Sequence, residues 1–109
     1  IAACGNVFLK LGGIGMPMMG FRWDKRDQPA NSVELVEAWS DPIQYAVEVI
    51  GANRCMFESN FPVDKRGVGY VPLWNSFKLI AADCSADEKR DLFHDTAARA
   101  YRLPLLADA

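Results

Sequence analysis

Two short apolar runs mark the candidate strands of this chain. The first, NVFLKL at residues 6–11, is nearly continuous and stops at Gly12-Gly13, and the second, RCMFE at residues 54–58, leads into a turn-rich segment over residues 59–62. Short apolar runs bounded by turn residues are typical of strands buried on both faces, as in parallel sheets. A helical segment lies between them, so residues 6–58 predict a βαβ unit with parallel strands.

The segment between the two strands has helical spacing. We expect Ser32 to cap a first stretch over residues 34–39 and Asp41-Pro42 to begin a second one, because Asp accepts backbone N–H groups and Pro tolerates the first helical position. Gly51 is expected to end the second stretch. Its apolar residues share one helical face: Ile43, Ala46, Val47 and Ile50.

Two more helices are predicted after the second strand. Residues 70–82 place an apolar stripe on one face, made of Leu73, Trp74, Phe77 and Ile80. Ser85 and Glu88 have the spacing of a capping box, which predicts the start of a final helix. We expect that helix to run through Leu103 and to stop at Pro104.

Residues 12–31 show no regular periodicity and contain four glycines and two prolines. A loop this long in a compact domain is typical of a segment that lines a site. Its glycines, Gly12, Gly13 and Gly15, either let the backbone approach a ligand or serve a turn. Three methionines in the same loop form either an apolar pocket wall or ordinary packing: Met16, Met18 and Met19.

Composition narrows the class of protein. The 109 residues include 12 basic and 14 acidic side chains, for a net charge of −2. Because there is no excess of basic residues to neutralise phosphates, we expect no nucleic-acid partner. No apolar run approaches the roughly 20 residues that span a bilayer, so no membrane partner is expected. The three cysteines, Cys4, Cys55 and Cys84, form no CxxC pair. They indicate reduced, mostly buried thiols in a cytoplasmic protein.

Two buried parallel strands are too few for a closed barrel or a doubly wound sheet. Parallel sheets normally contain several strands that are covered on both faces, because an unpaired edge exposes backbone N–H and C=O groups. The chain also begins Ile-Ala-Ala-Cys rather than with Met. We therefore expect the C-terminal portion of a longer α/β fold, or several copies that combine their strands.

The stretch RCMFESNFPVD, from Arg54 to Asp64, resembles the last barrel strand of the amidohydrolase-related family. NVFLKLGG resembles the preceding strand, and LWNSFKLI and SADEKRDLFHDTAARAYRL resemble the terminal helices. The resemblance implies a (β/α)₈ TIM barrel of about 250 residues, with its site at the carboxyl ends of the strands. Residues 1–109 would then be the C-terminal fragment of a single barrel domain.

The family pattern after the last strand, Ser-Asp-x-Pro, is Ser59-Asn60-Phe61-Pro62 here. In the family the acid binds a divalent metal or activates water, and an amide cannot accept a proton. Asp64 supplies the missing carboxylate if the loop folds back, or else it is a solvated loop acid. Asn60 either contacts substrate in the pocket or is a turn residue whose side chain bonds the local backbone.

The resemblance implies a hydrolase in which water attacks the carbonyl of a lactone or similar cyclic ester or amide. Asn60 and Asp64 are the candidate catalytic residues, and Lys10, Arg22 and Ser59 are the candidate substrate-binding residues. A cationic side chain at position 10 or 22 would anchor a substrate carboxylate. The substrate would be a small molecule.

No metal ligand is assigned in this chain. Its single histidine, His94, is expected on the outside of the last helix. A divalent metal in the full-length protein would use histidines from earlier strands. The isolated chain is therefore expected to be inactive, with the remainder of the barrel or another copy of the chain as its partner.

A non-catalytic interaction or structural module derived from the barrel is the alternative. An upstream His-x-His in the reading frame would favour the enzyme, whereas unrelated upstream sequence would favour the module.

Overall fold

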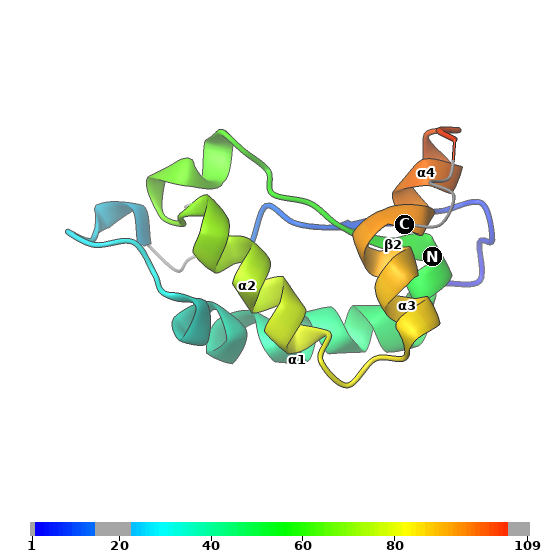
Figure 1. The fold of residues 1–109 in the computed structure, drawn as a ribbon, viewed down its shortest axis with the longest axis horizontal. Helices are drawn as coiled ribbons and strands as arrows, with labels where there is room; N and C mark the ends of the chain where they lie inside the picture. Colours follow the sequence, from blue (N-terminus) through cyan, green and yellow to red (C-terminus); the bar gives the residue numbers. More distant parts are fainter. Residues whose placement is uncertain (1, 15–22, 105–109) are drawn as a thin grey trace.

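A computed structural model describes residues 2–14 and 23–104. Two strands, β1 (Leu9–Leu11) and β2 (Cys55–Phe57), flank the long helix α1 (Ser32–Ile50). Three helices follow β2: α2 (Tyr70–Ile80), α3 (Ala86–Arg90) and α4 (Thr96–Ala100), with a π-helical turn over Asp91–Asp95 between the last two. Figure 1 shows α1 and α2 packed together, with the α3–α4 segment beside β2.

The predicted βαβ unit is confirmed. β1 and β2 are parallel, with Leu9 opposite Cys55 and Leu11 opposite Phe57. Both strands are shorter than predicted, because each pairs with only one neighbour in the described part of the chain. The α/β fold class is likewise confirmed.

Helix α1 is one continuous helix of 19 residues, so the predicted second start at Asp41-Pro42 is wrong. Pro42 lies inside it, and the buried stripe of Leu35, Trp39 and Ile43 runs past the proline. Pro42 lacks the N–H that would bond the carbonyl four residues earlier. Burial of this stripe against the core compensates for the lost bond.

The N-cap of α1 is Asn31 rather than the predicted Ser32. The Asn31 side-chain oxygen accepts from the Glu34 backbone N–H at 2.9 Å, and the Glu34 carboxylate accepts from the Asn31 N–H at 3.2 Å. This reciprocal pair places the glutamate at the third helical position, which Ser32 as the cap would not do. Gly51 ends the helix as predicted, and its N–H donates to the Val47 carbonyl.

The later helices follow the predicted pattern at their starts. The capping box of Ser85 and Glu88 is present, with the Glu88 N–H donating to the Ser85 hydroxyl at 3.1 Å. The last helix ends at Ala100, so its predicted extension to Leu103 is wrong. The reason is local, since Arg102 has a φ of 57° and the Leu103 N–H closes back on the Ala98 carbonyl at 2.7 Å.

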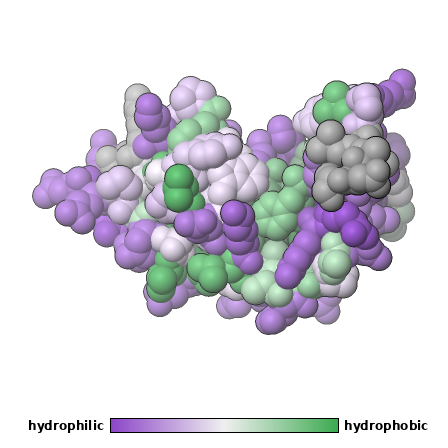
Figure 2. Space-filling view, viewed as in Figure 1, coloured by the Kyte–Doolittle hydropathy of each residue, from purple (hydrophilic) through white to green (hydrophobic). Residues whose placement is uncertain are grey.

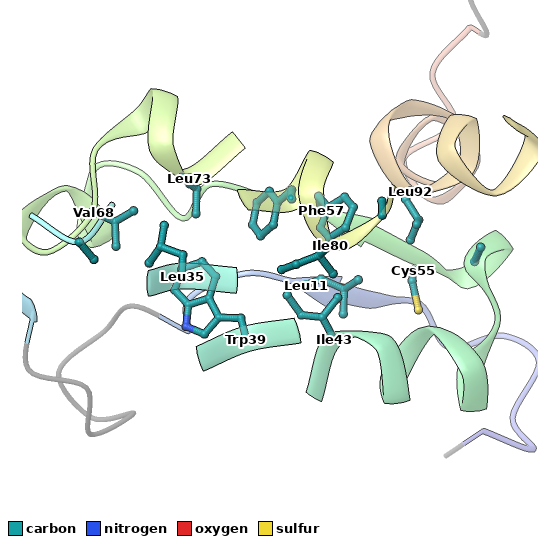
Figure 3. Packing of buried hydrophobic residues seen from close by; sticks show 14 of the residues in the cluster. Leu11, Leu35, Trp39, Ile43, Cys55, Phe57, Val68, Leu73, Ile80 and Leu92 are labelled. Carbon is teal, nitrogen blue, oxygen red and sulfur yellow. The ribbon is translucent and has the colours of Figure 1, made fainter. Parts of the chain in front are cut away.

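One face of the two-stranded sheet carries the core. Phe57 stacks on Phe77 of α2, with ring centroids 4.4 Å apart, and also contacts Phe93 at 4.8 Å. The side chains of α1 complete this face together with Leu11 (Figure 3). The cluster therefore joins both strands to α1, α2 and the π-helical turn.

The opposite face of the sheet, here called the Lys10 face, holds a half-exposed lysine beside the buried Met56. Side chains alternate along a strand, so the neighbours of the core residues point away from α1 and α2. Lys10 and Met56 are partners in the register on this face. Gly12 and Glu58 are the next residues on this face, two positions after Lys10 and Met56. The pairing of the strands reaches them, since the Glu58 N–H donates to the Leu11 carbonyl at 3.4 Å.

The three cysteines are free, and they differ in burial. Cys55 is buried, Cys84 is half-buried and Cys4 is exposed, so the prediction of mostly buried thiols is wrong for Cys4. Burial raises the pKa of the Cys55 thiol. Among the described residues, no helix combines the length and apolarity needed to cross a bilayer.

Candidate functional site

The carboxyl ends of β1 and β2 meet at one edge, because the two strands are parallel. Gly12 and Gly13 follow β1 at this edge, and Glu58, Ser59 and Asn60 follow β2. The segment before α1 also reaches the loop after β2, since the Ala30 N–H donates to the Gly67 carbonyl at 3.2 Å. The edge is thus bordered by the two loops in which the sequence predicts functional residues.

The loop after β2 folds back on itself. The Asn60 amide donates to the Asp64 carboxylate at 2.9 Å, and the Asp64 backbone N–H donates to the Asn60 carbonyl at 3.1 Å. Asn60 has a φ of 54°, a conformation that Asn tolerates better than most residues. The backbone reversal and the side-chain bond together hold the two candidate catalytic residues in contact.

Asp64 is only 2% exposed. The alternative of a solvated loop acid is therefore wrong. A carboxylate only accepts hydrogen bonds, so the NH₂ group of Asn60 must face Asp64. The side-chain carbonyl oxygen of Asn60 consequently points away from Asp64. It can accept a hydrogen bond from another group.

Ser59 is tied to the same loop. Its hydroxyl oxygen accepts from the Phe61 backbone N–H at 3.2 Å. A hydroxyl that accepts in this way still has one O–H to donate. Ser59 can thus still donate one hydrogen bond from the loop that holds Asn60.

Lys10 lies on the Lys10 face and pairs with a residue that sequence reasoning missed, Glu58. Its ammonium is 3.2 Å from the Glu58 carboxylate, and the Lys10 side chain is 49% exposed. Hydrogen bonding to Glu58, and then to Tyr101, raises the pKa of Lys10. The signal for Glu58 was available, because a carboxylate one residue beyond the second strand falls on the same face as Lys10.

Arg22, Gly15 and the three loop methionines lie outside the described residues. His94 is on the last helical segment, where it contacts its neighbour Asp95 at 2.8 Å.

The described residues do not by themselves fit a metal ion. Nowhere in the ranges 2–14 and 23–104 do three or more His, Cys, Asp or Glu side chains gather closely enough to hold one. Asn60 stands at the family's acid position and offers only an amide oxygen, a weaker ligand for a hard cation. No chemical step is therefore assigned to a metal here.

A hollow of about 590 Å³ lies on the other side of the sheet. Its apolar floor is visible between α2 and the α3–α4 segment (Figure 2). Phe57 and Leu92 line it, with Glu48, Asp83 and Glu88 at its polar margin. Of the candidate site residues that the structure describes, none borders this hollow: Lys10, Ser59, Asn60 and Asp64 lie elsewhere.

Comparison with known proteins agrees with the geometry. The amidohydrolase family model matches residues 1–103. An uncharacterized protein of Sinorhizobium fredii, y4mH, is 36% identical over 103 residues, which cover 94% of this chain and 30% of the relative. The chain thus spans about a third of that relative's length.

Solved structures give the same result. Two crystal structures of an amidohydrolase from Burkholderia multivorans, one with bound HEPES and one with bound Zn, match with a TM-score of 0.78 at 27% identity. Each match covers 94% of this chain and 34% of the solved one. With its parallel strands and helices superposing on part of an amidohydrolase TIM barrel, this chain belongs to the amidohydrolase family.

Proposed function

We propose that residues 1–109 are the C-terminal part of one barrel domain, in a hydrolase that directs water at the carbonyl of a lactone or similar cyclic ester or amide. The family match supports hydrolysis of a small molecule. The share of each relative that is covered, about a third, supports a barrel completed by other residues. The three free thiols support a cytoplasmic location.

The observation that carries the proposal is the Asn60–Asp64 pair at the carboxyl edge of β2. The side-chain carbonyl oxygen of Asn60, which points away from Asp64, accepts a hydrogen bond from the attacking water and so orients it. Asp64 is a positioning residue, because its burial keeps it behind Asn60. Ser59 and Lys10 lie at the same edge and contact the substrate.

An amide orients water but does not take its proton. The proton acceptor therefore belongs to another strand of the barrel, and the isolated 109-residue chain is inactive. Lactone hydrolysis by the purified chain would contradict this part of the proposal.

The test is a set of three variants of the full-length protein, assayed on a panel of lactones. Asp64→Asn replaces an acceptor-only carboxylate by an amide that can donate or accept, so position 64 no longer fixes which way the Asn60 amide faces, and we expect kcat to fall about 100-fold with KM unchanged. Asn60→Asp places two carboxylates within hydrogen-bond reach, which raises the pKa of one of them, and it should also lower kcat. The double variant Asn60→Asp/Asp64→Asn restores the hydrogen bond with its polarity exchanged and should recover most of the activity.

Thermal unfolding separates this role from a structural one. If the double variant regains stability but not kcat, the Asn60–Asp64 pair only holds the loop and the proposed mechanism is wrong. A wild-type protein that hydrolyses no cyclic ester or amide would instead favour a non-catalytic module built from the barrel.

A further inference from the structure

The Lys10 face of the sheet carries an ion pair whose charges cancel. The Lys10 ammonium lies 3.2 Å from the Glu58 carboxylate. Lys10 is central in β1 and Glu58 directly follows β2, so the pair bridges the two strands next to the carboxyl edge. A ligand that uses Lys10 as its cationic anchor must compete with the Glu58 carboxylate for the ammonium.

The surroundings hold Glu58 against this lysine. A Cβ atom on Gly12 would fall on the Glu58 side chain and would lie only 2.7 Å from the Glu58 carbonyl oxygen. The absence of a side chain at position 12 thus lets Glu58 lie across β1. Interaction with Tyr101 also raises the pKa of Lys10, after the larger effect of Glu58.

We propose that Glu58 determines specificity by occupying Lys10 and excluding carboxylate-bearing ligands from this part of the strand edge. The inference rests on the proposed function for its location in a substrate site. An incoming carboxylate would compete with Glu58 for the ammonium and would be repelled by the like charge beside it. The edge therefore selects a ligand that is uncharged where it faces Lys10.

This inference reverses the expected role of Lys10. Considered alone, a lysine at a strand end is an anchor for a substrate carboxylate. Together with Glu58 it is a neutral hydrogen-bonding unit, with the carboxylate accepting from a ligand O–H or N–H and the ammonium donating to a ligand carbonyl. Uncharged substrates rich in O–H, N–H and carbonyl groups can hydrogen-bond to both Lys10 and Glu58.

The test compares propionate with propionamide, which differ mainly in charge, by NMR titration of the full-length protein. Glu58→Gln keeps the size of the side chain and frees the ammonium, and we expect propionate to bind about ten-fold more tightly, with propionamide unchanged. Lys10→Met in the same background should abolish the gain. Glu34→Gln is the matched control, because it removes a carboxylate from another exposed ion pair, with Arg26, and should leave propionate binding unchanged.

Equal propionate affinity in wild type and Glu58→Gln would overturn the inference, as would a gain that persists without Lys10. A gain in Glu34→Gln of the same size would show an effect of net charge and would overturn it too. The titration requires no turnover, so it separates this inference from the proposed hydrolysis. If the protein hydrolyses no lactone but the Glu58→Gln variant binds propionate more tightly than wild type, only the hydrolase proposal fails.

Discussion

Single residues at the strand edge are constrained by their immediate neighbours. Gly12 is the clearest case, because the Glu58 backbone passes within 2.7 Å of where its Cβ would be. Sequence reasoning left open whether this glycine serves a ligand or a turn. The structure shows a third reason, the close approach of the neighbouring strand.

We expect Gly12→Ala to destabilise the full-length protein by about 1–3 kcal/mol, since the backbone of β2 must move away from β1. Urea unfolding measures this loss. Gly5→Ala is the matched control, because no atom lies within 4 Å of its added Cβ. Equal stability of the two variants would refute the close-approach argument.

At the scale of one element, the start of α1 is set by a reciprocal cap between Asn31 and Glu34. We expect Asn31→Ala to cost about 1 kcal/mol of unfolding free energy, because a helix N–H loses its acceptor. Ser32→Ala tests the cap that the sequence suggested and should cost much less. A larger loss for Ser32→Ala than for Asn31→Ala, by chemical denaturation, would contradict the observed cap.

The same cap has a predictable pH dependence. Hydrogen bonds from the Arg26 guanidinium and then from the Asn31 N–H lower the pKa of Glu34 below its usual 4.5. A group whose pKa is lower in the folded state stabilises it above the unfolded pKa, and that contribution is lost as pH falls through the folded pKa. We expect Glu34→Gln to lower the midpoint of thermal unfolding at pH 7 and to have little effect near pH 3. A difference that stays constant between these pH values would contradict this.

At the scale of the whole molecule, several large apolar side chains of the described residues are exposed. On α1 the exposed ones include Tyr45 at 68%, and on α2 they include Val71 at 67%. The described part of the sheet also has only two strands, each with one unpaired edge. Such surfaces favour association with further strands and helices.

We therefore expect the 109-residue chain, expressed alone, to self-associate as its concentration rises. Sedimentation velocity measures this. Tyr45→Lys and Val71→Lys place charges on the exposed helix faces and should reduce association, whereas Lys78→Arg on α2 keeps its charge and serves as the control. A chain that stays monomeric at all concentrations would contradict the open-barrel interpretation.

Local patterns accounted for much of the fold. The two apolar runs, the Ser85–Glu88 capping box and the glycine at the end of α1 each depend on neighbours within a few residues. Interactions of this range are encoded directly in sequence spacing. One error arose where packing outweighed local preference, at Pro42, where core contacts on both sides of the proline keep α1 continuous.

The order of elements, their parallel pairing and the resemblance to amidohydrolases are thus contained in the amino-acid sequence alone. The pairing of side chains at the strand edge is decided by tertiary structure. Asn60 contacts Asp64 only because the loop reverses, and Lys10 meets Glu58 only because β1 and β2 pair in one register. Contacts between residues 48 positions apart depend on how strands align in space, and a shift of one residue would place Glu58 on the other face.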